Sequence, residues 1–347
     1  MKAAVYRGVN QIRCEDVPVP QTGPGEVLVN IQACGLCQSD IKKILYPIHE
    51  PPRIFGHEMA GVVARVGEGV TDFAVGDRVA VMHHIPCLDC AHCRNECFSM
   101  CETYKTVTTT AGFIPSGGGY SEYICAPDHI ARHGIIPLPG DISFEEATFI
   151  EPVNCCLKAM EKVEIDSGER VLVIGAGPMG LLFVKLLRSY GATPIVSEPM
   201  DARRDRAVEA GATLAVNPAN ENAVRDIINF SDGMGADAAL LAVPNLKAAE
   251  FALEAVRKGG RILFFAEFPE EQALPLNPNF LYRSEISLHG SYSSSYKLQA
   301  LSADLIFSRA IEVRDLISDE LSLDQMSLAI EKATGPDERT MKILLRP

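Results

Sequence analysis

One short segment constrains the fold of this chain more than any other, because an apolar strand runs directly into a glycine-rich turn and then into a helix. The strand covers residues 171–174, and the turn reads Gly175-Ala-Gly177-Pro-Met-Gly180. In this context Gly175 permits a tight turn, Gly177 lets the backbone approach a pyrophosphate, and Gly180 lets the helix pack closely on the strand. The segment predicts a nucleotide-binding βα unit.

The region that follows repeats the alternation of strand and helix. Further apolar strands are predicted at 194–197, 213–216, 236–242 and 261–265, with helices between them, including one at 201–210. Strands that alternate with helices form a parallel sheet with helices on both faces. We therefore expect a doubly wound Rossmann sheet here.

The two ends of the chain have a different pattern. Before residue 150, short strands broken by Gly and Pro are predicted at 27–31, 59–66, 78–82 and 120–126, which favours an irregular β-rich domain. Near the C-terminus we expect helices at 298–307 and 323–332 and a closing strand at 341–345. The fold class is therefore α/β with a second, β-rich domain, to which the C-terminal segment could return.

The turn and the next strand indicate which dinucleotide is bound. Pro178 and Met179 open the helix, whose unpaired N–H groups attract an anion, and proline is well tolerated there. Glu198 ends the next strand, where a carboxylate accepts hydrogen bonds from the adenosine ribose and repels a 2′-phosphate. This favours NAD over NADP. Arg203 and Arg204 follow Glu198. Three roles stay open for them: binding a 2′-phosphate, stacking on adenine, or simple exposure to solvent.

Composition excludes several classes of partner. The chain has 347 residues, 47% of them hydrophobic, which is enough to build about two domains. A net charge of −13 gives no basic face for nucleic acid or an anionic membrane. Residues 1–8 lack the apolar core of a signal peptide, so we expect a cytoplasmic protein with no membrane partner.

Five of the 11 cysteines lie within one short segment, residues 87–101. Cys87, Cys90, Cys93 and Cys101 have the spacing C-x2-C-x2-C-x7-C, and four close thiolates suit a closed, structural zinc site. An iron–sulfur cluster is the alternative, and four free thiols are a weaker one. Cys97 lies between the ligands and is the surplus thiol, with the possibility that it replaces a neighbour.

Cys37 and the pair His57-Glu58 are weak candidates by their spacing, because a lone histidine after glycine is more often a loop residue than a ligand. Read in order with the four-cysteine segment, Glu151-Pro152 and the glycine turn, however, they give the chain a wider resemblance. Over essentially its full length it resembles the zinc-containing medium-chain alcohol dehydrogenases, and most closely the sorbitol (polyol) and L-threonine dehydrogenases.

The resemblance implies a domain organisation. It implies a GroES-like catalytic domain made of residues 1–150 and 286–347, with a structural zinc lobe at 87–101, and a Rossmann NAD-binding domain at 151–285. It also implies two zinc ions per chain, one catalytic and one structural, and a homotetramer or homodimer.

The resemblance also implies roles for individual residues. Cys37 and His57 would bind the catalytic zinc, Glu58 would bind or leave it, and Glu151 would bind it directly or through water. Ser39 would take the substrate's proton.

Two further residues receive roles in this way. Asp40 would orient the histidine ligand, the kind of support that a metal-bound imidazole needs. Cys155 would lie beneath the nicotinamide, while Cys156 is better read as a buried thiol.

Two departures from the family pattern limit the substrate assignment. Lys42 and Lys43 stand where many relatives carry a relay histidine, and residues 289–296 lack the arginine that sorbitol dehydrogenases show there. We expect NAD-linked oxidation of a secondary alcohol in a polyol, cyclitol or sugar derivative. The alternatives are an L-threonine or other amino-alcohol dehydrogenase, a carbonyl reductase, and a non-catalytic, zinc-stabilised nucleotide-binding protein.

Overall fold

The structure is a computed structural model that describes residues 1–347. The chain divides into a split unit, Met1–Asn154 with Ser294–Pro347, and a central unit, Cys155–Ser293. Helix α5 (Ile150–Lys162) contains the first of these boundaries. The predicted domain boundaries, after residues 150 and 285, lie four and eight residues before the limits of the two units and stay a prediction.

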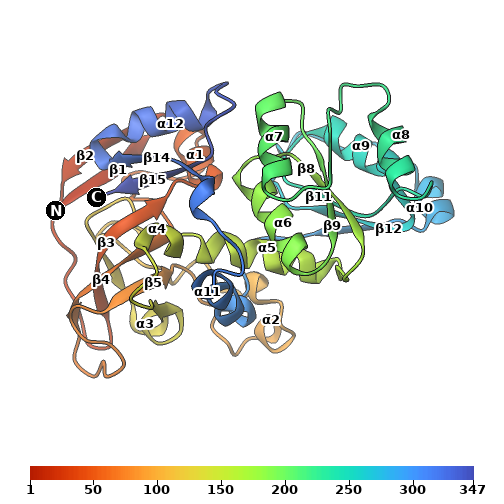
Figure 1. Cartoon of the computed structure of the whole chain (residues 1–347). Helices are drawn as coiled ribbons and strands as arrows, with labels where there is room; N and C mark the ends of the chain where they lie inside the picture. Colours follow the sequence, from red (N-terminus) through yellow and green to blue (C-terminus); the bar gives the residue numbers. More distant parts are fainter. The chain divides into compact units, whose positions relative to one another are not determined.

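The split unit is built on a seven-stranded sheet with the order β14-β15-β3-β4-β5-β7, and β6 also pairs with β3 (Figure 1). The C-terminal strand β15 pairs antiparallel with β3, so the chain end returns to the first sheet. Strand β3 is buried along most of its length because its apolar residues face other elements on both sides. The strands are β3 (Val27–Gly35), β4 (Glu58–Val66), β5 (Arg78–Met82), β6 (Tyr123–Ala126), β7 (Ile135–Pro137), β14 (Ile317–Ser322) and β15 (Lys342–Arg346).

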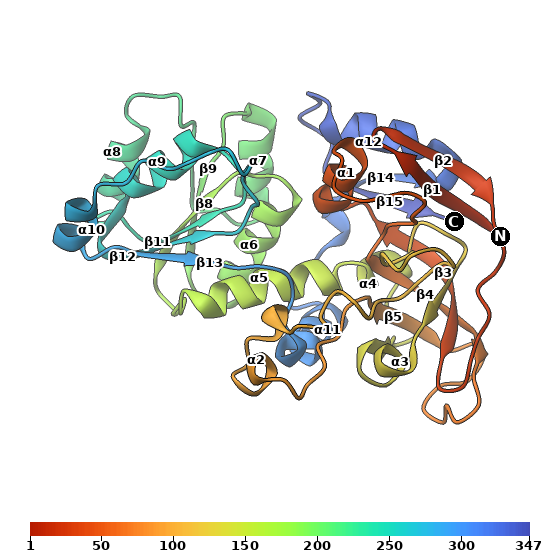
Figure 2. The ribbon, with the colours of Figure 1, turned by 180° about the vertical axis from the view of Figure 1, so that it is seen from behind.

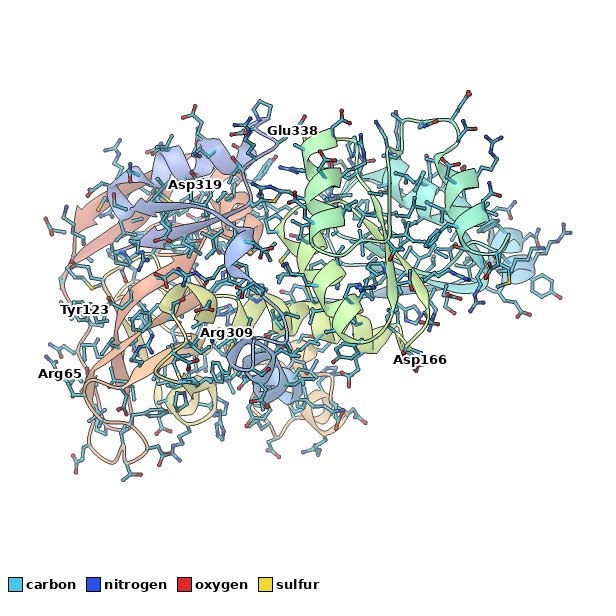
Figure 3. The ribbon with its side chains drawn as sticks, viewed as in Figure 1. Arg65, Tyr123, Asp166, Arg309, Asp319 and Glu338 are labelled. Atoms are coloured by element: carbon cyan, nitrogen blue, oxygen red, sulfur yellow. The ribbon has the colours of Figure 1, made fainter.

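A separate hairpin and several short helices complete the split unit. The hairpin consists of β1 (Lys2–Gly8) and β2 (Gln11–Asp16). In Figure 3, Asp319 lies on β14, where its carboxylate is 2.5 Å from Nζ of Lys332 on α12. The helices are α1 (Gln38–Leu45), α2 (Ala91–Arg94), α3 (Asp128–Gly134), α4 (Phe144–Ala147), α11 (Gln299–Phe307) and α12 (Met326–Thr334), with 3-10 turns η1 (Phe98–Met100), η2 (Tyr296–Leu298), η3 (Arg314–Leu316) and η4 (Leu323–Gln325).

The central unit is a six-stranded sheet with the order β10-β9-β8-β11-β12-β13, in which every neighbouring pair is parallel. This confirms the predicted doubly wound sheet. The strand order reverses between β8 and β11, which is where such folds bind their ligands. The strands are β8 (Arg170–Ile174), β9 (Thr193–Ser197), β10 (Leu214–Val216), β11 (Ala236–Leu241), β12 (Val256–Phe264) and β13 (Ser287–Gly290).

Helices cover both faces of this sheet. Figures 1 and 2 show α6 and α7 on one face and α8 and α9 on the other. Small and branched apolar side chains fill one core layer, among them Leu172, Ile195, Ala239 and Ala252, which are fully buried. The helices are α6 (Pro178–Ser189), α7 (Asp201–Glu209), α8 (Ala223–Phe230), α9 (Leu246–Ala255) and α10 (Pro278–Ser284).

Most predicted elements agree with the structure, with shifts at their ends. The strand predicted at 120–126 begins only at Tyr123, and the strand predicted at 261–265 begins at Val256. Helix α5 was not predicted; its Pro152 lies in the first turn, where the missing N–H costs little. No helix of the chain has the length and apolar character needed to cross a membrane.

Candidate metal centres and cofactor turn

The four predicted lobe cysteines come together in the structure. Their sulfur atoms all lie within 4.8 Å of one another, with 3.5 Å between Cys90 and Cys93 and 3.8 Å between Cys87 and Cys93. Cys97 is exposed and is not part of the group. Four convergent sulfurs with no other donor fit a closed tetrahedral zinc site.

The local backbone already favours thiolate at parts of this cluster. The backbone N–H of Cys87 donates to Cys101 Sγ at 3.3 Å, and that of Cys90 donates to Cys87 Sγ at 3.3 Å. Burial alone raises the pKa of Cys101, but hydrogen bonds from Cys87 and Thr103 outweigh it and lower the pKa to about 6. Burial raises the pKa of Cys93 to about 12. Cys101 therefore ionises more readily than Cys93.

The second group is assembled by strand pairing. Gly35 at the end of β3 pairs with Glu58 at the start of β4, so Cys37 and His57 meet at one end of the sheet. The donor atoms of Cys37, His57 and Glu58 lie within 4.8 Å of one another. A thiolate, an imidazole and a carboxylate are donors that zinc accepts, and the small number of donors leaves room for a further ligand.

Asp40 is the buried carboxylate that organises this group. It is fully buried, its Oδ2 lies 2.9 Å from Nδ1 of His57, and the same oxygen accepts from the hydroxyl of Tyr120 at 3.0 Å. Its Oδ1 accepts from Nζ of Lys43 at 2.7 Å. Burial alone would raise the pKa of Asp40, but the charges of His57 and Lys43 reverse this and lower it. Asp40 thus stays ionised and lies against the ring of His57, where it can orient the ring as the family resemblance implies.

The charge near His57 has a matching effect on the imidazole. Burial lowers the pKa of His57, but the negative charges of Asp40 and Cys37 outweigh it and raise the pKa well above its usual value. The site therefore attracts positive charge at the position where a metal ion would bind.

Glu58 has a buried partner that the sequence analysis missed. Nζ of Lys342 on β15 donates to Glu58 Oε1 at 2.6 Å, and both side chains are buried. Burial lowers the pKa of Lys342, but the charges of Glu58 and Cys37 raise it above its usual value, so it stays charged. Gly35 makes the pair possible, because a Cβ there would lie 1.9 Å from Glu58 Oε2. The only sign of this pair in the sequence is a single lysine, Lys342, within the apolar strand predicted at 341–345.

Ser39 and the two lysines after Asp40 have distinct surroundings. Ser39 is exposed, and its hydroxyl donates to Cys37 Sγ at 3.3 Å, which places it beside the candidate metal group. Lys43 pairs with Asp40 and lies over the ring of Phe55 at 5.5 Å. Lys43 is therefore engaged in holding Asp40. Lys42 is half-buried on α1.

The structure does not bring every predicted residue into the metal group. Glu151, in the first turn of α5, is 8% exposed and is not among the three residues whose donors converge, although its charge helps to raise the pKa of Lys342. Its role as a ligand stays a prediction. Cys155 is half-buried in the central unit, and its place beneath the nicotinamide stays a prediction, while Cys156 is fully buried.

The glycine turn has the geometry that its three glycines predict. Gly175 has a φ of +98°, and a Cβ there would lie 2.5 Å from Val243 Cγ1. At Gly180 a Cβ would lie 1.9 Å from the carbonyl oxygen of Gly175, so only glycine lets the helix approach the strand. At Gly177 a Cβ would meet nothing within 4 Å, which leaves open space before Pro178 and Met179 at the start of α6. A pyrophosphate fits such a turn.

Glu198 is tied to this turn by hydrogen bonds. Its Oε2 accepts from the backbone N–H of Ala176 at 2.8 Å, and its Oε1 accepts from that of Met200 at 3.0 Å. Arg204 donates to the carbonyl oxygens of Glu198 and Pro199, both at 2.7 Å. Arg204 therefore supports the backbone at the end of β9. Arg203 is half-buried on α7.

Two histidines beside the candidate metal group were also missed. His83 and His84 follow β5, and the ring centroid of His83 lies 4.7 Å from that of His57. Burial lowers the pKa of both histidines well below the usual value. Their place in the sequence, as two adjacent histidines between a strand and the first lobe cysteine, could have marked them as candidates.

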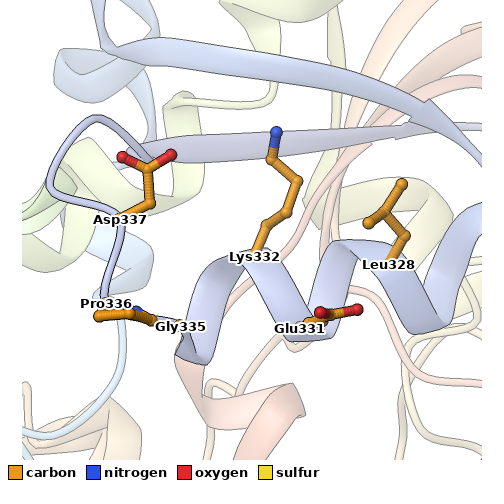
Figure 4. Close-up of a pocket in the computed structure, with 6 residues that line it drawn as sticks. All are labelled: Leu328, Glu331, Lys332, Gly335, Pro336 and Asp337. Carbon is orange, nitrogen blue, oxygen red and sulfur yellow. The ribbon is translucent and has the colours of Figure 1, made fainter.

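One shallow pocket of the split unit is unrelated to these groups. It lies at the C-terminal end of α12, as the close-up in Figure 4 shows. None of its residues is a predicted metal or cofactor ligand, so it is not the candidate site. The lining residues are Leu328, Glu331, Lys332, Gly335, Pro336 and Asp337.

Comparison with known proteins agrees with this arrangement. The model of the alcohol dehydrogenase GroES-like domain matches residues 23–139, and the model of the zinc-binding dehydrogenase family matches residues 178–308. The sorbitol dehydrogenase of Bacillus subtilis (strain 168) is 31% identical over 355 residues, which cover 100% of this chain and 97% of that protein. The L-threonine 3-dehydrogenase of Pyrococcus horikoshii is 34% identical over 283 residues, 79% of this chain and 78% of that protein.

A solved structure is similar over the same length. A zinc-binding dehydrogenase from Sinorhizobium meliloti 1021, with bound NADP, has a TM-score of 0.90 and 28% identity, covering 100% of this chain and 99% of that chain.

The chain therefore belongs to the zinc-binding alcohol dehydrogenase family. It is an oxidoreductase that uses zinc and a nicotinamide dinucleotide and acts on small alcohol substrates. The family resemblance, the α/β fold with GroES-like and Rossmann parts, and the class of enzyme predicted from the sequence are confirmed.

Proposed function

We propose that this protein is an NAD-linked dehydrogenase that oxidises a secondary alcohol of a polyol, cyclitol or sugar derivative to the ketone. The observation that carries the proposal is the convergence of Cys37, His57 and Glu58 within 4.8 Å, with the exposed hydroxyl of Ser39 beside them. The similarity to a sorbitol dehydrogenase over nearly its whole length supports the substrate class. A homo-oligomer and a cytoplasmic location belong to the same proposal.

In this proposal Cys37 and His57 hold the catalytic zinc, while Glu58 and Glu151 are further candidate ligands. When bound there, zinc would supply Lewis-acid chemistry toward an alcohol hydroxyl, and a nicotinamide dinucleotide would supply the hydride acceptor. Cys87, Cys90, Cys93 and Cys101 hold a structural zinc.

The chain's own residues supply the rest. Asp40 contacts Nδ1 of His57, which would leave the opposite ring nitrogen available to a metal ion. Ser39 Oγ, which donates to Cys37 Sγ in the structure, is the proposed acceptor of the substrate's proton. Lys342 neutralises the charge of Glu58, so this carboxylate has two alternative partners, the ammonium group of Lys342 and a metal ion.

We also propose that NAD is preferred to NADP. The carboxylate of Glu198, at the end of β9, would repel a 2′-phosphate, and Arg204 is engaged with backbone carbonyls. The solved relative with bound NADP makes this preference worth testing directly.

An L-threonine dehydrogenase is the second candidate, because a relative with that activity is 34% identical. A substrate panel separates the two. NADH formation would be measured with sorbitol, xylitol, inositols, L-threonine and simple secondary alcohols, with Cys37→Ala as the inactive variant and Cys97→Ala as the matched control. Turnover of a polyol with NAD supports the proposal. Turnover of L-threonine in preference to every polyol overturns the proposed substrate class.

If a fully zinc-loaded protein turns over no substrate of the panel, the group formed by Cys37, His57 and Glu58, here named the Cys37 group, is not a catalytic site for these alcohols. This result would favour a zinc-stabilised nucleotide-binding protein without turnover.

A further inference from the structure

A continuous row of aromatic rings joins the candidate catalytic group to the four-cysteine lobe. The centroid of His57 lies 4.7 Å from that of His83, and His83 lies 3.7 Å from His84. The ring of His84 lies 5.2 Å from that of Tyr104. These four residues all belong to the split unit, so the row does not depend on the placement of the central unit.

The far end of the row is part of the lobe itself. Tyr104 is 4% exposed and packs in one buried cluster with Cys93 and Cys101. Its hydroxyl lies 3.2 Å from the hydroxyl of Ser294, a bond between buried groups. The position of Tyr104 is therefore set by the cysteines on one side and by the returning chain on the other.

The backbone closes the lobe at the same place. His84 forms a β-bridge with Thr108, and the N–H of Thr109 donates to the carbonyl oxygen of His83 at 3.3 Å. The segment that leaves the lobe thus pairs with the segment that enters it. A metal ion held by Cys87 and Cys101 would hold the same loop closed from its other side.

The near end of the row is the ring of His57, a candidate metal ligand whose Nδ1 faces Asp40. Asp40 lies 2.9 Å from Nδ1 of His57, and the ring of His83 packs beside the same imidazole at a tilt of 40°. Loss of a group that orients a metal-bound histidine typically lowers metal affinity by about 10- to 100-fold. Packing of His83 against this ring further restricts its rotation.

We propose that His83, His84 and Tyr104 are positioning residues that couple the four-cysteine lobe to His57, so that metal in the lobe strengthens metal binding at the Cys37 group. This inference rests on the proposed function, in which Cys37 and His57 hold a metal. The coupling acts through ring packing, so an aromatic ring of similar shape preserves it and a small aliphatic side chain does not.

The test measures zinc release from the holoenzyme into a chromogenic chelator. Cys37→Ala identifies the phase that belongs to the Cys37 group. His84→Ala is expected to accelerate this phase about tenfold, at the low end of the effect of orienting groups. His84→Phe, which keeps a ring, stays within about twofold of the wild type. His92→Ala, at an exposed histidine of the same lobe, is the matched control and leaves the phase unchanged.

A second pair of variants covers the case in which His84→Ala does not fold. Tyr104→Leu removes the ring at the lobe end and is expected to accelerate the same phase, whereas Tyr104→Phe keeps the ring and removes the hydroxyl that bonds to Ser294. With cobalt in the Cys37 group, the d–d absorption shifts in Tyr104→Leu and not in Tyr104→Phe.

The outcomes separate this inference from the proposed function. If His84→Ala and Tyr104→Leu release the zinc of the Cys37 group at the wild-type rate, the coupling is wrong and the proposed function stands. If each phenylalanine variant releases zinc at the same rate as its aliphatic counterpart, the coupling does not act through ring packing. If the wild type releases zinc only from the lobe, both the coupling and the proposed function are overturned.

Discussion

The two metal-ligating groups differ in how the chain assembles them. The four cysteines of the lobe lie within 15 consecutive residues. Hydrogen bonds between near neighbours in sequence, such as Cys90 N–H to Cys87 Sγ, order them locally. The Cys37 group needs the pairing of β3 with β4, and its buried ammonium, Lys342, comes from the last strand of the chain. The lobe is therefore a local structure that metal can close, whereas the second group exists only when the sheet is complete.

The largest expected effect is on catalysis at the Cys37 group. Cys37→Ala removes a ligand at the position where substrate would bind, and loss of Lewis-acid stabilisation of several kcal/mol corresponds to a decrease of about 1000-fold or more in kcat/KM. Steady-state kinetics with the best alcohol of the panel measures it. The exposed Cys97→Ala variant serves as the control, and a decrease of less than about tenfold in Cys37→Ala would refute the ligand assignment.

The second prediction concerns the buried pair of Lys342 and Glu58. Lys342→Met leaves a buried carboxylate without its partner, which is expected to destabilise the metal-free protein by about 3–5 kcal/mol. Chemical unfolding under chelating conditions measures the change. Adding Glu58→Gln removes the unpaired charge and should recover much of the stability. A double variant as unstable as the sum of the two single variants would show that the two side chains act independently.

The third prediction concerns the lobe. Cys90→Ala opens its metal site, and loss of a structural metal ranks among the large destabilising mechanisms. We expect Tm to fall by roughly 10 °C, on a scale of about 2–4 °C per kcal/mol. Calorimetry with Cys97→Ala as the matched control tests it, and equal melting temperatures for the two variants would argue against zinc in the lobe.

The smallest effect is expected in the central unit. Glu198→Gln keeps an acceptor for the N–H of Ala176 and removes the charge that faces a 2′-phosphate. The preference for NAD over NADP should fall by about tenfold or more, because juxtaposed like charges cost several kcal/mol. The exposed Asp205→Asn on α7 is the control. An unchanged ratio of kcat/KM values would remove Glu198 from the selection of cofactor.

The same contrast explains what the sequence could predict. The lobe, the glycine turn and the strands at 78–82 and 171–174 were predictable because each signal lies within a few residues. Helix α5 was not, since Pro152 resembles a helix breaker until its place in the first turn is known.

The long-range parts of the site left weaker signals. Lys342 is 284 residues from Glu58, so nothing local connects them. The rings of His83 and His84 meet His57 only because β5 pairs with β4, with Glu58 opposite Met82. The family resemblance, rather than spacing, supplied the roles of Cys37 and His57, and for Glu151 the structure leaves the predicted role without a direct contact in the metal group.

The central claim is that one chain holds two zinc ions in separate groups of different kinds. Zinc content per chain, measured in the wild type, Cys37→Ala and Cys90→Ala, tests it most directly. We expect about two zinc ions in the wild type and about one in each variant, with only Cys37→Ala retaining the ion of the lobe. One zinc ion in the wild type, lost in Cys90→Ala and unaffected by Cys37→Ala, would contradict it.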